Sequence, residues 1–411
     1  MLIPLALFAL TYLLVSGVRL PGLVLDRTGA ALAGAVAMVA VGGLPLSGAW
    51  RAINLDTLGL LFGMMVVTAY LVEAGFFARL AWETVARSGS PRRLLVALVF
   101  VAGGLSALFV NDTICVMFTP LVVAVVDAAA LPSLPFLLAL TTATNLGGVA
   151  TYTGNPQNMI VGTHAGISFG HYALHMLPVA VLGLGADAAL LSWMFRRELS
   201  SGAFAGAAAP RPPVDGALVA KTFVALAVAL AGFFTGHSLA GSALAAAAVV
   251  VVLARRPPGP LLRRVDYPLL VFFAALFVVV AGVDHTGALA AARDALVPRL
   301  GHEPGTQIVN FSLITVAGSN LFSNVPFVLL GLDTVPRLAD PHTGWLALAM
   351  ASTLAGNLTI FGSVANLIVL ELAGRHGRVS FLVFLRYGVV VTAVTLFIGL
   401  GVLLVEQRLG W

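Results

Sequence analysis

The sequence predicts an all-α integral membrane protein built from two inverted repeats, with about ten transmembrane helices and two re-entrant hairpins. Of its 411 residues, 60% are hydrophobic and 9% are charged, with a mean hydropathy of +1.02. This balance lies far from that of a soluble domain. Apolar windows of about 20 residues, the length that crosses a bilayer, recur along the whole chain. Some are interrupted by short polar segments, and the interruptions follow the same order in both halves.

Eight apolar windows are uninterrupted and predict ordinary spanning helices. They are residues 2–20, 29–48, 56–74, 172–195, 217–236, 238–254, 266–283 and 381–405. The first window has neither a basic leader nor a small-residue cleavage site, so we expect a retained helix and not a cleaved signal. Targeting then requires only membrane insertion.

Four further apolar regions carry polar interruptions. Two are predicted to be hairpins, 91–127 and 306–335, and two are predicted to be broken helices, 135–163 and 345–372. In hydrocarbon an unpaired peptide group costs several kcal/mol, so a broken backbone is tolerated only where protein or a water-filled cavity satisfies it. Each interruption therefore marks buried polar space.

The order of these elements indicates an internal duplication. Residues 1–199 form the first predicted repeat, 200–216 a Pro/Ala/Gly-rich linker and 217–411 the second repeat. If each hairpin leaves the membrane on the side from which it entered, each half crosses the membrane five times, and an odd number inverts the second half. Matched polar and glycine positions support the duplication: Asp56, Gly154 and Asn158 recur as Asp266, Gly362 and Asn366.

The distribution of basic residues predicts the orientation. The formal net charge is +5, but no Lys/Arg-rich run accompanies it, so a nucleic-acid partner is not expected. With the topology above, sixteen of the 22 Lys and Arg residues fall on one face. The other face receives Arg51, Arg293, Arg299, Arg337 and Arg408. The positive-inside rule makes the first face cytoplasmic, which places both termini outside and predicts a multi-pass protein of the bacterial inner (plasma) membrane.

The interruptions contain the candidate ion- and solute-binding residues. A re-entrant tip offers free helix N-termini, free carbonyls and short polar side chains to a ligand. The structural alternative is that Asn, Ser and Thr merely cap helix ends at these turns. The candidates at the two tips are Asn111, Asp112, Thr113, Ser323 and Asn324. Those in the broken helices are Thr144, Asn145, Asn155, Gln157, Asn158, Asn357, Thr359, Ser363 and Asn366.

Asp112 is the strongest candidate among them. A carboxylate deep in a membrane costs roughly 2.5 to 3.5 kcal/mol even on lenient scales and is kept mainly for a function. Desolvation favours its protonated form, so Asp112 could load and release a proton as access alternates. Direct binding of a cation such as sodium by the ionised form is the alternative. The second tip has no counterpart carboxylate, so the first half is expected to hold the coupling site while both halves share the solute.

Several other residues admit a structural interpretation. Asp187 could be a proton relay or pair with a polar neighbour, Arg386 is expected to reach the cytoplasmic interface, and Cys115 is expected to be an apolar packing residue. His164, His171 and His175 lie close together in the sequence, but no spacing there resembles a zinc site. We therefore expect solvated loop histidines and no metal site.

No catalytic motif is present. The sequence contains no Gly-x-Ser-x-Gly elbow, no His-Glu-x-x-His and no phosphate-binding or dinucleotide fingerprint. We therefore expect no enzyme activity, no catalytic residues and no cofactor. Energy must come from an ion gradient, from the membrane potential or from a separate ATPase subunit.

The tip and break motifs resemble those of one family. Asn111-Asp112-Thr113 and Gly154-Asn155-Pro156-Gln157-Asn158 are similar to motifs of the ion transporter superfamily. The similar branch holds the ArsB-type arsenite permeases, citrate-metal permeases, NhaD-type sodium/proton antiporters and the melanosomal P protein. Symporters of the wider superfamily have Ser-Asn-Thr at both tips, whereas Ser323-Asn324 is followed here by Val325. A pair of matched sodium sites is therefore not expected.

The resemblance implies an elevator-type transporter. The hairpins and broken helices would move as a transport domain against a scaffold of the first three helices of each half, in a homodimer in the lipid bilayer. Amides and hydroxyls, with no arginine beside them, suit a small anion or a neutral oxyacid such as arsenite. The alternatives are a di- or tricarboxylate (citrate-type) permease, a sodium/proton antiporter and, from another class, a channel-like pore or an embedded component of a complex.

Overall fold

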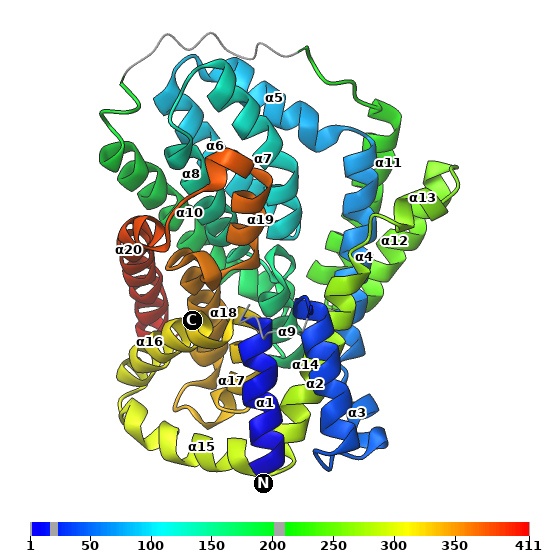
Figure 1. Ribbon diagram of the computed structural model, residues 1–411, viewed down its shortest axis with the longest axis vertical. Helices are drawn as coiled ribbons and strands as arrows, with labels where there is room; N and C mark the ends of the chain where they lie inside the picture. The colour runs from blue at the N-terminus through cyan, green and yellow to red at the C-terminus, as the bar shows by residue number, and fades with distance from the viewer. Residues whose placement is uncertain (1, 17–23, 201–209, 411) are drawn as a thin grey trace.

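The fold is helical throughout the part of the chain that the structure describes. The structure is a computed structural model that describes residues 2–16, 24–200 and 210–410, and every regular element in these ranges is a helix. Most of the predicted linker and the end of the first predicted helix lie outside the described residues. The helices form two groups that lie side by side (Figure 1).

The first group contains the opening helices of each half. α4 packs on α12, α14 packs on α2, and α11 packs on α12 (Figure 1, right side). The members are α1 (Leu2–Val15), α2 (Arg27–Ala40), α3 (Leu46–Ala52), α4 (Leu55–Glu73), α11 (Gly216–Phe234), α12 (Leu239–Ala254), the short α13 (Gly259–Leu262) and α14 (Tyr267–Asp284). We call this group the framework.

One predicted helix is shorter than expected. The window 29–48 forms α2 only as far as Ala40 and is followed by a turn and by α3. Gly43 in this turn has φ +82°, and Pro45 precedes the first residue of α3. A left-handed glycine followed by a proline ends a helix irrespective of hydropathy.

The second group contains the interrupted regions and the last helix of each half, and we call it the core group. α6 packs on α8, α16 on α18, and α10 on α20. In chain order, the members are α6 (Pro91–Ser106), α7 (Asn111–Ala128), α8 (Ser133–Gly148), α9 (Pro156–His164), α10 (Phe169–Met194), α16 (Pro304–Phe322), α17 (Asn324–Gly331), α18 (Pro341–Leu354), α19 (Val364–Leu372) and α20 (Phe381–Leu409).

Two amphipathic helices escaped the hydropathy windows. α5 (Phe76–Ser88) follows α4, and α15 (Ala288–Leu296) follows α14, so both stand at the same place in the order of their half. Each begins after a left-handed glycine, Gly75 or Gly287. A helix with one polar face does not produce an apolar window of membrane-spanning length.

Within the part of the chain that the structure describes, six helices are long and apolar enough to cross a membrane. They are α4, α7, α10, α11, α14 and α20, and the shorter α1, α2 and α12 are also apolar. Large apolar side chains such as Leu382 and Phe397 are 74% and 78% exposed on α20. Exposed apolar surface of this kind suits lipid and not water, so the chain is a multi-pass membrane protein.

Close helix contact in the core group depends on glycine. A Cβ atom on Gly147 of α8 would lie 1.9 Å from the carbonyl oxygen of Gly103 on α6, whereas one on neighbouring Gly104 would meet nothing within 4 Å. Small residues let the backbones of membrane helices approach closely. This contact fixes the first hairpin against the first broken helix.

Ion pairs fasten the C-terminal end of the linker to both halves. Arg211 binds Glu83 at 2.6 Å, and Arg256 binds Asp215, which also caps α11 by accepting from Leu218 N at 3.0 Å. The hydrogen bond from Leu218 and the Arg256 guanidinium lower the pKa of Asp215 below its usual range. The ionised carboxylate is therefore the form that stabilises the fold.

The Asp215 cap makes a small pH-dependent contribution to stability. Because the folded-state pKa is lowered, this contribution is complete above the ordinary carboxyl pKa of about 3.9 and is lost as the pH falls through the lowered value. We expect Asp215→Ala to lower the thermal unfolding midpoint by a few degrees at pH 7 and by less at pH 3. Thermal unfolding of the detergent-solubilised protein measures this decrease in the midpoint. An equal decrease at both pH values would contradict the pH-dependent contribution of Asp215.

Candidate functional site

The two tips and the two breaks meet at one small cavity, which we call the tip cavity. Its volume is about 40 Å³, enough for about three water-sized groups. Leu269, Phe272 and Phe273 of α14 form an apolar wall on the framework side. The remaining lining residues come from the interruptions: Asn111, Asp112, Pro156, Gln157, Ser323, Asn324, Val325, Ser363 and Val364.

Four helix N-termini converge on this cavity. α7, α9, α17 and α19 begin at Asn111, Pro156, Asn324 and Val364, and each of these residues lines it. A helix N-terminus carries roughly half a positive charge and free N–H groups. The tip cavity is therefore an electropositive site that favours oxygen atoms.

The first tip supplies an amide and a carboxylate. Asn111 is buried and accepts a hydrogen bond from Asp112 N at 3.0 Å through its side-chain oxygen. Asp112 is half-buried, and no donor reaches its carboxylate among the described residues. The charges of Asp266 and Arg27 act on it through space. Asp112 is thus the member of the site whose carboxylate is available to a proton or a solute.

Asp112 also lines a second, larger cavity, which we call the C-terminal α4 cavity. It measures about 400 Å³ and runs between the second half of α4, the first tip and the start of α14, with Thr113 on its wall. Arg264 and Asp266 line it too, so the expectation that no arginine lies beside the site is wrong. Arg264 lies at the start of the second half and reaches the first tip only through the fold. Its guanidinium is paired with Glu73 at 2.7 Å.

Asn145 joins the two halves beneath the tip cavity. Its side-chain oxygen accepts from Asn111 Nδ2 and from Ser363 Oγ, both at 3.1 Å. Its amide nitrogen donates to Asn357 Oδ1 at 2.9 Å and lies 3.5 Å from Asn366 Oδ1. Asn145 therefore connects the first tip to the second broken helix and is fully engaged with protein.

Two asparagines perform the same task in the two breaks. Asn158 Nδ2 donates to the carbonyls of Gly148 and Thr151 at 2.8 and 3.3 Å. Asn366 Nδ2 donates to those of Gly356 and Thr359 at 2.7 and 3.0 Å. These carbonyls are freed where α8 and α18 end, so the amides satisfy backbone groups that the broken helices leave unpaired.

Three further break residues bond to protein and do not line the tip cavity. Asn155 caps α9 by accepting from Asn158 N at 2.8 Å, and Thr144 Oγ1 donates to Leu140 O at 2.9 Å within its own helix. Thr359 donates to Asn320 Oδ1 at 2.8 Å. Of the predicted residues, those at the tip cavity are Asn111, Asp112, Gln157, Ser323, Asn324 and Ser363.

The second tip is strained and incompletely bonded. Ser323 has φ +73° and ψ 157°, a region that essentially only glycine occupies and that costs roughly 1 to 3 kcal/mol. The side-chain oxygen of buried Asn324 has no hydrogen-bond partner within the described structure. Strain and an unsatisfied buried acceptor at a cavity wall indicate a ligand-contacting position.

Comparison with known proteins identifies the family. Residues 11–355 match the citrate transporter family (CitMHS). The chain belongs to the citrate transporter family. Its tip and break motifs are thus those of a transporter family, and their meeting at one cavity agrees with that.

Relatives in this family differ in what their names describe. The silicon efflux transporter LSI3 of Oryza sativa subsp. japonica is 33% identical over 90% of each chain. The transporter arsB of Dictyostelium discoideum is 26% identical, covering 91% of this chain and 86% of its own. The crystal structure of the YdaH transporter of Alcanivorax borkumensis covers 100% of this chain and 99% of its own, with a TM-score of 0.61 at 18% identity. This similarity shows that the two chains share a fold.

Asp187 is connected through Thr142 to the asparagine side chains beside the tip cavity. It is fully buried on α10, and its Oδ2 accepts from Thr142 Oγ1 at 2.8 Å. Its Oδ1 has no partner among the described residues. The backbone oxygen of Thr142 in turn lies 3.4 Å from Asn357 Nδ2. Asp187 therefore has the polar neighbour that one interpretation expected.

Cys115 and Arg386 occupy ordinary positions. The Cys115 thiol is buried 3.3 Å from Thr144 Oγ1. Arg386 is exposed near the start of α20, and its guanidinium lies 5.9 Å from the centre of the Tyr387 ring. Neither side chain reaches the tip cavity.

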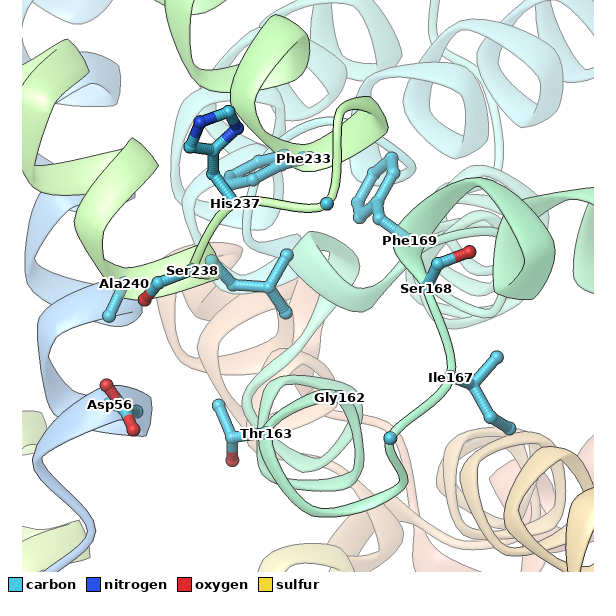
Figure 2. A pocket seen from close by; sticks show the side chains of 13 residues that line it. Asp56, Gly162, Thr163, Ile167, Ser168, Phe169, Phe233, His237, Ser238 and Ala240 are labelled. Carbon is cyan, nitrogen blue, oxygen red and sulfur yellow. The ribbon is translucent and has the colours of Figure 1, made fainter.

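A third cavity lies at the other end of α4, and we call it the N-terminal α4 cavity. It has a volume of about 430 Å³. Figure 2 shows it between Asp56, the α9–α10 turn and the α11–α12 turn. No predicted site residue lines it. Beside it, Thr57 Oγ1 of α4 lies 3.0 Å from Thr163 Oγ1 of α9. This contact joins the framework to the core group at the wall of the cavity.

Two of the three predicted loop histidines are not solvated loop residues. His164 is exposed, but His171 and His175 lie within α10, and His175 is 2% exposed. Its Nδ1 lies 3.0 Å from Glu406 of α20. The expectation failed because the partners come from elements more than 160 residues away in the sequence.

We expect Asn145→Leu to destabilise the protein and to abolish solute transport. The substitution leaves the buried polar groups of Asn111, Asn357 and Ser363 without their partner, at roughly 1 to 3 kcal/mol each. Thermal unfolding in detergent and proteoliposome flux measure the two effects. Asn310→Leu is the control, because Asn310 makes one hydrogen bond, to Leu300 O at 2.9 Å, away from the site. Equal effects of both variants would contradict the role of Asn145.

Proposed function

We propose that this protein is a proton-coupled secondary transporter of a small uncharged metalloid hydroxide, of the arsenite or silicic acid class. The tip cavity would bind the solute, and Asp112 would carry the proton. The single observation that supports this most is the convergence of four helix N-termini and of Asp112 on one small cavity. Both the solute and the proton would then act at the same place.

The size and polarity of the tip cavity favour such a solute. Its volume of about 40 Å³ suits a compact molecule and is far too small for citrate. Helix N–H groups and the Asn111 amide can donate to the hydroxyl oxygens, while Asn324 Oδ1 and the Asp112 carboxylate can accept from the hydroxyl protons. The names of the silicon and arsB relatives agree with this class.

The charges around the C-terminal α4 cavity also favour a neutral solute. Arg264 is offset by its partner Glu73, and Asp112 and Asp266 add two carboxylates. A di- or tricarboxylate would meet repulsion on this route. Two arguments favour the citrate-type alternative: the family is described as citrate transporters, and the helix N-termini are electropositive.

The cavities support alternating access. Asp112 lines the C-terminal α4 cavity, whereas no predicted site residue lines the N-terminal α4 cavity. With the arginine-rich face in the cytoplasm and both termini outside, this conformation would be open inward in a bacterial inner membrane. An elevator movement of the core group against the framework, as inverted repeats allow, would transfer the tip cavity to the other side.

The proposal includes one protein partner, a second copy of this chain. A homodimer would hold the framework still while the core group moves. A separate ATPase subunit remains an alternative energy source to the proton gradient, and sodium remains the alternative coupling ion.

Uptake into proteoliposomes tests the proposed function. Vesicles are prepared with an imposed pH gradient, with a sodium gradient or with neither, and receive arsenite, silicic acid, citrate or phosphate. We expect saturable flux of arsenite or silicic acid that follows the pH gradient. Citrate accumulation would support the citrate-type alternative, sodium–proton exchange without solute would indicate the antiporter, and unsaturable flux would indicate a pore. Any of these three results would contradict the proposal.

A further inference from the structure

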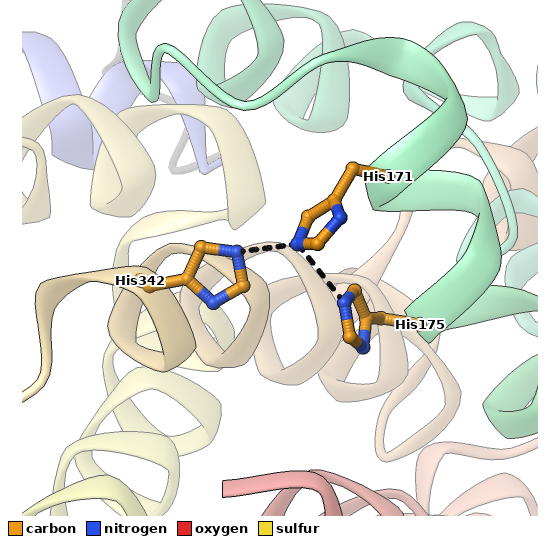
Figure 3. A group of neighbouring side chains, drawn as sticks. All are labelled: His171, His175 and His342. Atoms are coloured by element: carbon orange, nitrogen blue, oxygen red, sulfur yellow. Dashed lines mark hydrogen bonds between the residues drawn. The ribbon is translucent and has the colours of Figure 1, made fainter. Parts of the chain in front are cut away.

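Three histidine rings meet beside α20, near the N-terminus of α10. His171 and His175 stand one turn apart on α10, and His342 lies in the first turn of α18, so the three rings point toward one another (Figure 3). His171 Nε2 lies 3.1 Å from His342 Nε2 and 3.0 Å from His175 Nε2. The three ligand atoms lie within 4.8 Å of one another.

A carboxylate fixes the ring of His175. The Glu406 Oε2 atom lies 3.0 Å from His175 Nδ1, so Nδ1 carries the proton and Nε2 presents its lone pair to the other two histidines. A carboxylate behind the ring is the usual support of a metal-binding histidine, because it fixes the tautomer and raises the basicity of the ring. Glu406 thus prepares Nε2 of His175 for a cation.

Hydrogen bonds alone do not satisfy this cluster. His175 Nε2 has no proton to donate, so His171 Nε2 must donate to it. A protonated His171 Nε2 has no lone pair left to accept from His342 at 3.1 Å. One short nitrogen–nitrogen contact is therefore poorly bonded when all three rings are neutral. A cation bound to the three lone pairs removes this conflict.

The spacing fits a first-row transition metal. Zinc–nitrogen bonds of about 2.0–2.1 Å place two tetrahedral nitrogen ligands roughly 3.3 Å apart, close to the 3.0 and 3.1 Å found here. Three neutral imidazoles suit zinc over magnesium or calcium, which prefer oxygen. His171 is exposed, His175 is buried and His342 is half-buried, so an ion can enter from solvent past His171.

We propose that His171, His175 and His342 bind a zinc ion through Nε2, with Glu406 supporting His175 from behind. The ion would join α10 to α18 beside α20, all within the core group. It would therefore brace the body that is proposed to move and leave its contacts with the framework free. This site is separate from the tip cavity, and its residues take no part in the proposed transport step.

Metal binding to the purified protein tests the site without any measurement of transport. Protein stripped with a chelator is titrated with zinc by calorimetry, and its thermal unfolding midpoint is recorded with and without zinc. We expect one equivalent of zinc to bind and to raise the midpoint. His342→Ala should weaken binding by more than about 100-fold, and Glu406→Gln by about 10- to 100-fold, as for other supporting carboxylates.

His302→Ala is the matched control, because His302 is exposed and lies outside the cluster; it should bind zinc as the unaltered protein does. If His342→Ala fails to fold, His342→Gln replaces it, and X-ray absorption of the zinc-loaded unaltered protein should show three imidazole nitrogens. Absence of stoichiometric zinc binding, equal losses in the His342 and His302 variants, or a bound ion without three imidazole ligands would overturn the proposal.

Discussion

Asp112→Asn should abolish accumulation driven by a pH gradient while it leaves solute exchange intact. With one proton per solute, a gradient of one pH unit can support about tenfold accumulation, since one pH unit corresponds to about 1.4 kcal/mol. A side-chain amide keeps the size of the carboxyl group and, like its protonated form, offers one donor group and one acceptor oxygen, but it cannot release a proton. The measurement compares net uptake under a pH gradient with exchange of labelled solute at equal pH.

The control for this variant changes a carboxylate in the same cavity. Asp266 lines the C-terminal α4 cavity and caps α14 by accepting from Leu269 N at 3.0 Å. Asparagine caps helices equally well. Asp266→Asn should therefore retain accumulation. If both variants lose accumulation equally, or if Asp112→Asn remains fully active and equally sensitive to the pH gradient, Asp112 is not the proton carrier.

Gly147→Ala should destabilise the protein by about 3 kcal/mol or more and should stop transport. The added methyl group would lie 1.9 Å from the Gly103 carbonyl oxygen, and neither backbone can move aside as a side chain can, so α6 and α8 must separate. Separation would move the first tip away from Asn145 and open the site. Thermal unfolding in detergent and proteoliposome flux measure these effects.

Gly104→Ala is the matched control on the facing helix. A Cβ atom at Gly104 meets nothing within 4 Å, and alanine is the better helix former by roughly 0.8 to 1.0 kcal/mol. This variant should be as stable as the original or more so. Comparable destabilisation by both substitutions would show that helix contact at Gly147 is not the cause.

The sequence predicted most of the helices for a physical reason. Lipid demands long apolar segments and penalises broken ones, so windows of apolar residues and their polar interruptions stand out without any alignment. The tip residues Asn111, Asp112, Ser323 and Asn324 stood out as polar groups in apolar surroundings, and they do meet at one cavity.

Other parts of the site could not be predicted because they depend on contacts distant in the sequence. Asn158 and Asn366 look like ligands in the sequence, yet their amides bind carbonyls freed by their own breaks. Arg264 belongs to the second half and reaches the first tip only in the folded protein. His342 likewise reaches His171 across 171 residues, a distance at which no spacing motif operates.

Amphipathic helices and turns were a different kind of failure. α5 and α15 carry polar residues on one face, so a hydropathy window long enough to detect a spanning helix averages their signal away. The premature end of α2 depended on Gly43 and Pro45, which local turn chemistry would have identified. Periodicity and turn signals were therefore informative where average hydropathy was not.

In the proposed mechanism, one site serves the solute and the proton together. The most direct test starts with proteoliposomes at equal pH inside and outside and imposes a gradient of silicic acid or arsenite, while a trapped pH indicator is recorded. We expect a saturable pH change that accompanies solute flux and is absent with Asp112→Asn. Solute flux without any pH change, or a pH change that citrate alone produces, would contradict it.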